Sequence, residues 1–144
     1  MKAGIYHLII KFPGKKVIKV GRLGAFLFPK GFYVYTGSAQ VGLGKRVARH
    51  LSQEKKLHWH IDYLLQFGEI VDVLTIHGAK NRECVLSNQI ALSLGGRVIA
   101  EKFGSSDCKC RTHLYFFEHT PEIKNLLRGA KKYRTVKKED FTGC

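Results

Sequence analysis

The chain has 144 residues, of which 25 are Lys or Arg and 11 are Asp or Glu, and this length predicts one domain with a single core. Its apolar fraction of 44% is ordinary for a globular protein and excludes a fibrous or largely disordered chain. The absence of a long apolar run and of a signal-peptide pattern excludes a membrane-spanning protein. We therefore expect a cytoplasmic domain over residues 1–132, followed by a basic tail over residues 133–144.

The excess of positive charge occurs in both halves of the chain, so it is not the property of a single tail. The positive electrostatic potential of such a chain favours a polyanionic partner, and a nucleic acid is the commonest one. A membrane surface is the weaker alternative, because the sequence has no basic amphipathic helix with a broad aromatic face. A basic surface that only keeps the protein soluble is the second alternative.

The first third of the chain has the pattern of strands joined by turns. Residues 4–12 are rich in Ile, Leu and Tyr and predict a largely buried strand. Residues 15–20 alternate charged and β-branched side chains and predict its hairpin partner. A short excursion at 21–27 leads to a third strand at 32–36, on which Tyr35 shares a face with the other tyrosine of that strand.

The segment from residue 43 to residue 51 predicts a basic amphipathic helix. Its apolar side chains recur at every fourth position, at Leu43, Val47 and Leu51. We expect Arg46, Arg49 and His50 to lie on the flanks of this helix, where they can face solvent or a ligand.

The rest of the chain alternates helices and strands. We predict a short helix at 61–66, a strand at 70–77, a helix at 82–94, strands at 97–103 and 113–117 around a polar loop, and a helix at 121–128 before a basic end. The fold class is therefore a small mixed α/β (α+β) domain with a central, mainly antiparallel sheet flanked by helices.

Two short strings on different predicted strands carry a resemblance to a known family. Gly4-Ile5-Tyr6, followed by Tyr35-Thr36-Gly37-Ser38, resembles the two-part signature of the GIY-YIG nuclease superfamily. The likeness continues through Lys45-Arg46-x-x-Arg49-His50, which is similar to a helix of homing endonucleases and of the excision-repair incision nuclease, and then through His58 and Glu83. It covers most of residues 3–94 and is closest to a small, stand-alone branch known mainly as a domain of unknown function.

The resemblance implies a metal-dependent endonuclease that hydrolyses DNA phosphodiester bonds. In that reading Tyr6 or Tyr35 orients or deprotonates the attacking water, and Arg46 neutralises phosphate oxygens. Glu83 holds one Mg²⁺ or Mn²⁺ ion, and His58 moves a proton. Without the resemblance, the same tyrosines would be read as core aromatics and the arginine as part of a solvated helix face.

Further basic side chains are predicted to contact the nucleic acid, with DNA favoured over RNA. They are Lys45, Arg49, His50 and His60. His60 also competes with His58 for the family's histidine position, and we prefer His58 because Ile61 then aligns better. The chain has one extra residue between the second tyrosine and the helix arginine, and we expect no separate DNA-binding module of the kind usual in this superfamily. We therefore expect binding through phosphates and DNA shape more than through base sequence.

Four residues of the second half have side chains that zinc accepts as ligands. They are Cys84, Cys108, Cys110 and His113. The spacing between the two loop cysteines is tighter than in common zinc knuckles. The alternative to a zinc site is that Cys84 is a small buried apolar residue, and that a polar loop brings Asp107 near the site. The first rival hypothesis is a catalytically inactive nucleic-acid-binding module, with or without zinc. The second is an interaction protein that zinc stabilises.

Overall fold

The structure is a computed structural model that describes residues 3–53, 55–123 and 131–134. Its main sheet is antiparallel, with the strand order β6-β7-β4-β1-β5-β8. The strands of this sheet are β1 (Gly4–Phe12), β4 (Gly31–Ala39), β5 (Glu69–Ile76), β6 (Arg97–Val98), β7 (Leu114–Phe117) and β8 (Lys131–Arg134). A second, two-stranded sheet consists of β2 (Lys16–Val20) and β3 (Gly24–Phe28), with a 3₁₀ turn at Gly21–Leu23 between them.

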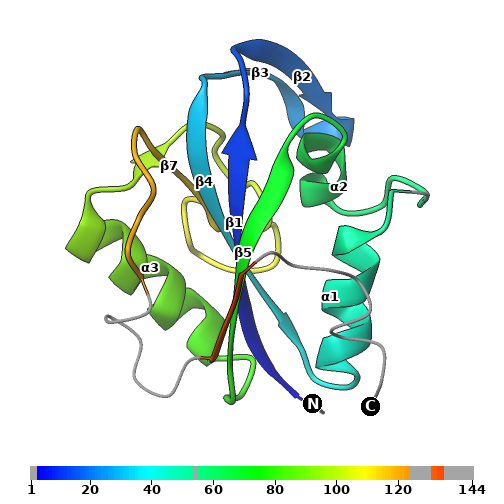
Figure 1. The fold of residues 1–144 in the computed structure, drawn as a ribbon, viewed down its shortest axis with the longest axis vertical. Coiled ribbons are helices and arrows are strands. Elements are labelled where there is room, and N and C mark those ends of the chain that lie inside the picture. The colour runs from blue at the N-terminus through cyan, green and yellow to red at the C-terminus, as the bar shows by residue number, and fades with distance from the viewer. Residues whose placement is uncertain (1–2, 54, 124–130, 135–144) are drawn as a thin grey trace.

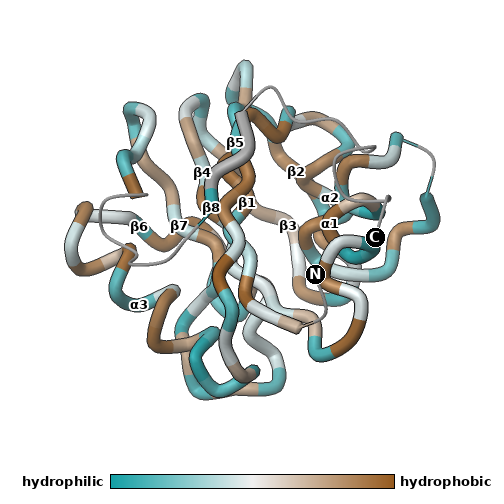
Figure 2. The backbone as a smooth tube through the Cα atoms, turned by 60° about the horizontal axis from the view of Figure 1, so that its bottom comes forward, coloured by the Kyte–Doolittle hydropathy of each residue, from teal (hydrophilic) through white to brown (hydrophobic). Residues whose placement is uncertain are grey.

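Helices cover both faces of the main sheet (Figure 1). The helices α1 (Leu43–Leu51) and α2 (His60–Leu65) lie on one side and α3 (Arg82–Leu94) lies on the other. Because successive side chains of β1 alternate between the two faces, this strand contributes to two cores and is apolar along most of its length. One core contains Leu8 and Val47, and the other contains Ile9 and Ile90. In Figure 2, hydrophobic segments follow the central strands.

The predicted fold class is confirmed: an antiparallel sheet is flanked by helices. The helices predicted at 43–51 and 82–94 have those bounds, and the strand at 4–12 does too. Among the helices of the described residues, none is long and apolar enough to cross a membrane.

Some predicted elements are corrected. The segment 15–20 was expected to pair with the first strand, but both edges of β1 are taken by β4 and β5, so β2 pairs with β3. The strand predicted at 97–103 ends at Val98, because the chain turns through Lys102, whose φ is +64°. Residues 121–123 are not helical, and the rest of the helix predicted at 121–128 lies outside the described residues.

The sheet also includes residues 131–134, at the point where the basic tail was predicted to begin. The strand β8 pairs antiparallel with β5, from Thr75 opposite Lys131 to Asp72 opposite Arg134. It therefore lies across the predicted boundary between the domain and its tail at residue 132.

Candidate active site and metal cluster

A cleft of about 370 Å³ lies at the edge of β4, where its pairing with β7 ends. The two strands pair only as far as Tyr35, so side chains from both faces of the sheet can reach the edge beyond it. Six residues singled out from the sequence line this cleft: Tyr6, Tyr35, Arg46, His58, His60 and Glu83. The structure thus brings together all five predicted catalytic residues and one of the predicted nucleic-acid contacts.

Tyr6 is the most deeply placed of these groups. Its side chain is 2% exposed, and its hydroxyl lies 2.7 Å from Nε2 of His50, across the boundary between β1 and α1. Burial raises the pKa of Tyr6 well above its ordinary value of 10, and the nearby Arg46 opposes that shift. At neutral pH the phenol of the free protein is therefore protonated, and it needs an added positive charge before it can act as a base.

The space for the Tyr6 ring depends on Gly37, which lies opposite Tyr6 in the β1–β4 register. A Cβ at this position would lie 2.5 Å from Cζ of Tyr6, inside van der Waals contact. We predict that Gly37→Ala lowers the free energy of unfolding by about 1–3 kcal/mol, measured by denaturant titration. Gly14→Ala is the matched control, since no atom lies within 4 Å of a Cβ there. Equal stability of the two variants would contradict this packing.

Tyr35 lies next to Tyr6 on the same face, with ring centroids 6.4 Å apart. Burial raises its pKa well above 10, and the neighbouring Tyr6 and the Glu83 carboxylate raise it further. The loop residue Gly104 packs on this ring, and its φ of +70° is a conformation that favours glycine. Arg46 opposes the rise in pKa at both tyrosines, and for Tyr6 it is the largest effect after burial.

His50 is not the solvent-facing nucleic-acid contact that the sequence predicted. Its side chain is 2% exposed because it faces the core between Tyr6 and Trp59. Burial lowers the pKa of His50 from its ordinary 6.5 to about 3, and the neighbouring cations Lys55, Arg49 and Arg46 act in the same direction. The imidazole is therefore neutral at neutral pH and serves as the hydrogen-bond partner of Tyr6.

This shift predicts a pH-dependent stability. The unfolded chain takes up a proton on His50 near pH 6.5 and the folded chain does so only near pH 3, so the stabilisation is complete above pH 6.5 and is lost as the pH falls toward 3. We expect this residue to add about 1.4 kcal/mol per pH unit to the loss of unfolding free energy between roughly pH 6 and 4. Denaturant titrations of the wild type and of His50→Gln measure the difference in slope. Parallel profiles would contradict the neutral buried imidazole.

Arg46 is held at the mouth of the cleft by two contacts. Its Nη1 donates a hydrogen bond to the carbonyl oxygen of Ser38, at 3.1 Å, and its Cζ lies 4.6 Å from the centre of the Trp59 ring. A planar guanidinium held in this way keeps its orientation while other N–H groups remain for a ligand.

Arg49 has a structural role in place of the predicted nucleic-acid contact. Its two terminal nitrogens each donate to Asp62, at 3.0 Å, and Nη2 also donates to the carbonyl of Lys56. Asp62 is fully buried and also accepts from the backbone N–H groups of His58 and Trp59, at 2.8 and 2.9 Å. This ion pair joins α1 to the start of α2 and fixes the two histidines around Trp59.

The two candidate histidines differ in how they are held. His60 accepts a hydrogen bond at Nδ1 from the backbone N–H of Gly104, at 2.9 Å, so the neutral ring carries its proton on Nε2. Burial lowers the pKa of His60 below 6.5. His58 is exposed and its ring lies 5.3 Å from that of Trp59. Both line the cleft, and Lys45 remains exposed on α1.

Glu83 reaches the cleft from α3, on the opposite face of the sheet from Tyr6. The hydroxyl of Ser38 donates to its Oε2 at 2.6 Å, and Nδ1 of His113 lies 2.9 Å from its Oε1. The carboxylate is only 14% exposed. Ser38 therefore holds two cleft groups at once, with its hydroxyl on Glu83 and its carbonyl on Arg46.

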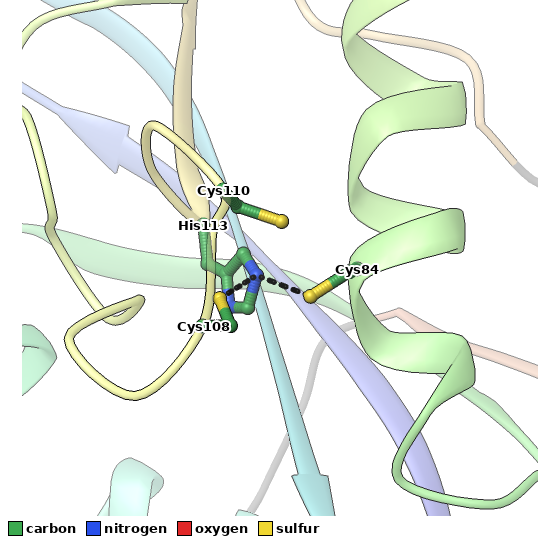
Figure 3. A group of neighbouring side chains, drawn as sticks. All are labelled: Cys84, Cys108, Cys110 and His113. Atoms are coloured by element: carbon green, nitrogen blue, oxygen red, sulfur yellow. Dashed lines mark hydrogen bonds between the residues drawn. The ribbon is translucent and has the colours of Figure 1, made fainter.

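His113, which contacts Glu83, belongs to a group of four side chains of types that ligate metals (Figure 3). They are Cys84 of α3 and Cys108, Cys110 and His113 of the loop that follows β6, and their ligand atoms all lie within 4.8 Å of one another. The group can hold a metal ion, and its three sulfurs and one imidazole suit zinc better than Mg²⁺. These three cysteines are free of disulfides, and Cys84 is half-buried and faces the loop.

The family to which the chain belongs follows from comparison with known families. The family described as Domain of unknown function DUF123 matches residues 5–135, almost the whole chain. The chain belongs to this family. Comparison with curated proteins and with solved structures gave no significant match.

In this DUF123 chain, two contacts of the site were not found from the sequence, whereas the expected position of Asp107 near the site agrees with the structure. The Ser38 contact to Glu83 and the His113 contact to the same carboxylate depend on how α3 packs against the sheet. Asp107 lines the cleft, with a side chain that is 70% exposed and lies 3.5 Å from Nζ of Lys80. The spacing of residues along α3 gives no signal for these contacts.

Proposed function

We propose that this DUF123 domain is a divalent-metal-dependent endonuclease that hydrolyses the phosphodiester bonds of DNA. The supporting observation is that one cleft is lined by side chains from three elements and both faces of the sheet. These side chains are Tyr6, Arg46 and Glu83. They are the same residue types, in the same chain order, as in the GIY-YIG nucleases that the sequence resembles. A cleft with a guanidinium, two phenols and a carboxylate has the groups that phosphodiester hydrolysis needs.

Each group has a role that its surroundings support. Arg46, fixed by Ser38 and Trp59, would bind the non-bridging oxygens of the scissile phosphate. Tyr6 or Tyr35 would orient the attacking water, and Arg46 favours the ionised form of both phenols. His60 presents Nε2–H as a donor for the phosphate or the leaving oxygen.

The residues fit a hard divalent cation at Glu83. Its carboxylate oxygens each have two lone-pair directions, so the contacts to Ser38 and His113 leave capacity for a cation. Mg²⁺ keeps several waters and commonly binds through one carboxylate and the substrate's phosphate. When bound, such an ion would polarise the phosphate and lower the pKa of water, and the chain's part is to hold Glu83 in place.

DNA binding would depend mainly on charge. The chain carries a formal net charge of +14, and exposed Lys45 and Lys80 lie beside the cleft residues Arg46 and Glu83. Contacts of this kind position a phosphate backbone without reading bases, so we propose selectivity for DNA structure over sequence.

The test is a cleavage panel of supercoiled plasmid, single strand, flap and four-way junction, each with Mg²⁺, Mn²⁺ or chelator. The proposal expects cleavage of at least one substrate with metal and none with chelator. The rival function, a catalytically inactive binding module, expects salt-sensitive binding to the same substrates without cleavage. Binding without cleavage in both metals would reject the proposed enzyme.

A further inference from the structure

The imidazole of His113 lies between the three cysteines of this group and the Glu83 carboxylate of the cleft. Its Nε2 is 3.5 Å from Sγ of Cys84 and 3.6 Å from Sγ of Cys108, whereas its Nδ1 is 2.9 Å from Oε1 of Glu83. The ring is almost completely buried, with a side chain that is 2% exposed. Its two nitrogens therefore face two different groups, one made of sulfur atoms and one made of carboxylate oxygens.

The distances around Nε2 match those of a tetrahedral zinc site. Zn–S bonds of about 2.3 Å and a Zn–N bond of about 2.05 Å at tetrahedral angles place each sulfur about 3.6 Å from the nitrogen. The two observed Nε2–Sγ distances agree with this value, and Cys110 lies within the same group. Cys₃His is one of the common ligand sets of structural zinc.

The loop is built in a way that favours a metal-thiolate group. Nζ of Lys102 donates to the backbone carbonyls of Cys108 and Cys110, at 3.0 and 3.2 Å, and so joins the backbones of the two cysteines. The hydroxyl of Ser105 also donates to the carbonyl of Cys110, at 3.1 Å.

We propose that Cys84, Cys108, Cys110 and His113 form a structural zinc site that orients Glu83 through His113. A histidine that binds zinc through Nε2 carries its proton on Nδ1, and here Nδ1 lies 2.9 Å from Oε1 of Glu83. Zinc would also join α3 to the loop that brings Gly104, Ser106 and Asp107 to the cleft. The zinc site is independent of the proposed function, whereas its effect on catalysis rests on it. His113 is thus a positioning residue for Glu83.

Zinc content of the full chain, purified without added metal, tests the site itself. We expect about one equivalent of zinc, and Co²⁺ exchanged into the site should give the intense thiolate charge-transfer absorption of a tetrahedral site. Cys110→Ser should lose most of the bound metal, while Ser106→Ala, in the same loop but outside the group, should keep it. Zinc below about a fifth of an equivalent, even after reconstitution, would overturn the zinc site.

His113→Cys tests the orientation of Glu83, because four cysteines also bind zinc tetrahedrally while the contact from Nδ1 to the carboxylate is lost. We expect this variant to keep about one equivalent of zinc and to bind Mn²⁺ roughly tenfold more weakly, measured by electron paramagnetic resonance. Unchanged Mn²⁺ affinity in a zinc-loaded variant would overturn the positioning role. This readout needs no cleavage, so it separates that failure from a failure of the proposed function, which would appear as no cleavage by the wild type.

Discussion

Glu83→Gln is expected to lower the single-turnover cleavage rate by about a thousandfold. The substitution keeps the shape of the side chain and its contact with Ser38 but removes the negative charge that would hold the divalent cation. Lewis-acid stabilisation by such a cation amounts to several kcal/mol, which corresponds to a rate factor of this size. The measurement is cleavage of the best panel substrate with enzyme in excess, over a range of Mn²⁺ concentrations.

The matched control for this variant is Glu101→Gln. Glu101 is exposed and pairs with Arg111, and it does not line the cleft. Its rate should stay within about twofold of the wild type, since surface substitutions away from a site have small effects. Cleavage by Glu83→Gln at the wild-type rate would remove the carboxylate from the proposed metal site.

Tyr6→Phe is expected to lower the same rate by roughly a hundredfold or more, because the variant cannot orient or deprotonate the attacking water. It also leaves the buried Nε2 of His50 without its hydroxyl partner, which should cost about 1–3 kcal/mol of unfolding free energy. Rate and stability are therefore measured together, by single-turnover cleavage and by denaturant titration.

Tyr33→Phe separates the two effects of the Tyr6 substitution. Tyr33 is buried on the same face of the sheet, and its hydroxyl donates to the carbonyl of Pro29, at 2.6 Å, outside the cleft. Removing this hydroxyl should cost about 1 kcal/mol of stability and leave the cleavage rate unchanged. If both phenylalanine variants lost the rate equally, the loss would reflect packing and the role of Tyr6 would be rejected.

The elements found from the sequence are those with strong local patterns. The spacing of Leu43, Val47 and Leu51 fixes the inner face of α1, and its bounds agree with the structure. The alternation of side chains along strands also places Tyr6 and Tyr35 on one face once β1 and β4 are paired. Such patterns depend on the sequence within a few residues, which is why they could be read directly.

His50 illustrates a signal that was present but given too little weight. It follows Val47 by three positions and Leu43 by seven, so the helical period puts it on the buried face of α1. Its polar side chain and the arginine beside it suggested a solvent-facing role. The structure buries it because the hydroxyl of Tyr6 offers a hydrogen-bond partner where α1 packs on β1.

The contacts around Glu83 could not be predicted because they depend on packing between distant segments. Whether Cys84 meets the loop cysteines depends on how α3 lies across the sheet. Ser38 reaches the Glu83 carboxylate from β4, and His113 reaches it from the loop before β7. The pairing of β8 with β5 is also non-local, and its basic composition resembled a solvated tail. Sequence patterns predicted the residue types of the site but not its connections.

The proposed nuclease activity of this cleft is tested most directly by the ratio of plasmid cleavage rates in Mg²⁺ and in chelator. The ratio is measured for wild type and Tyr6→Phe purified by the same procedure. A contaminating nuclease would be present in both preparations, so only an activity of this cleft can differ between them. We expect metal-dependent cleavage by the wild type and a rate lower by roughly a hundredfold in the variant. Equal cleavage by the two proteins, or binding without cleavage by the wild type, would contradict the proposed activity.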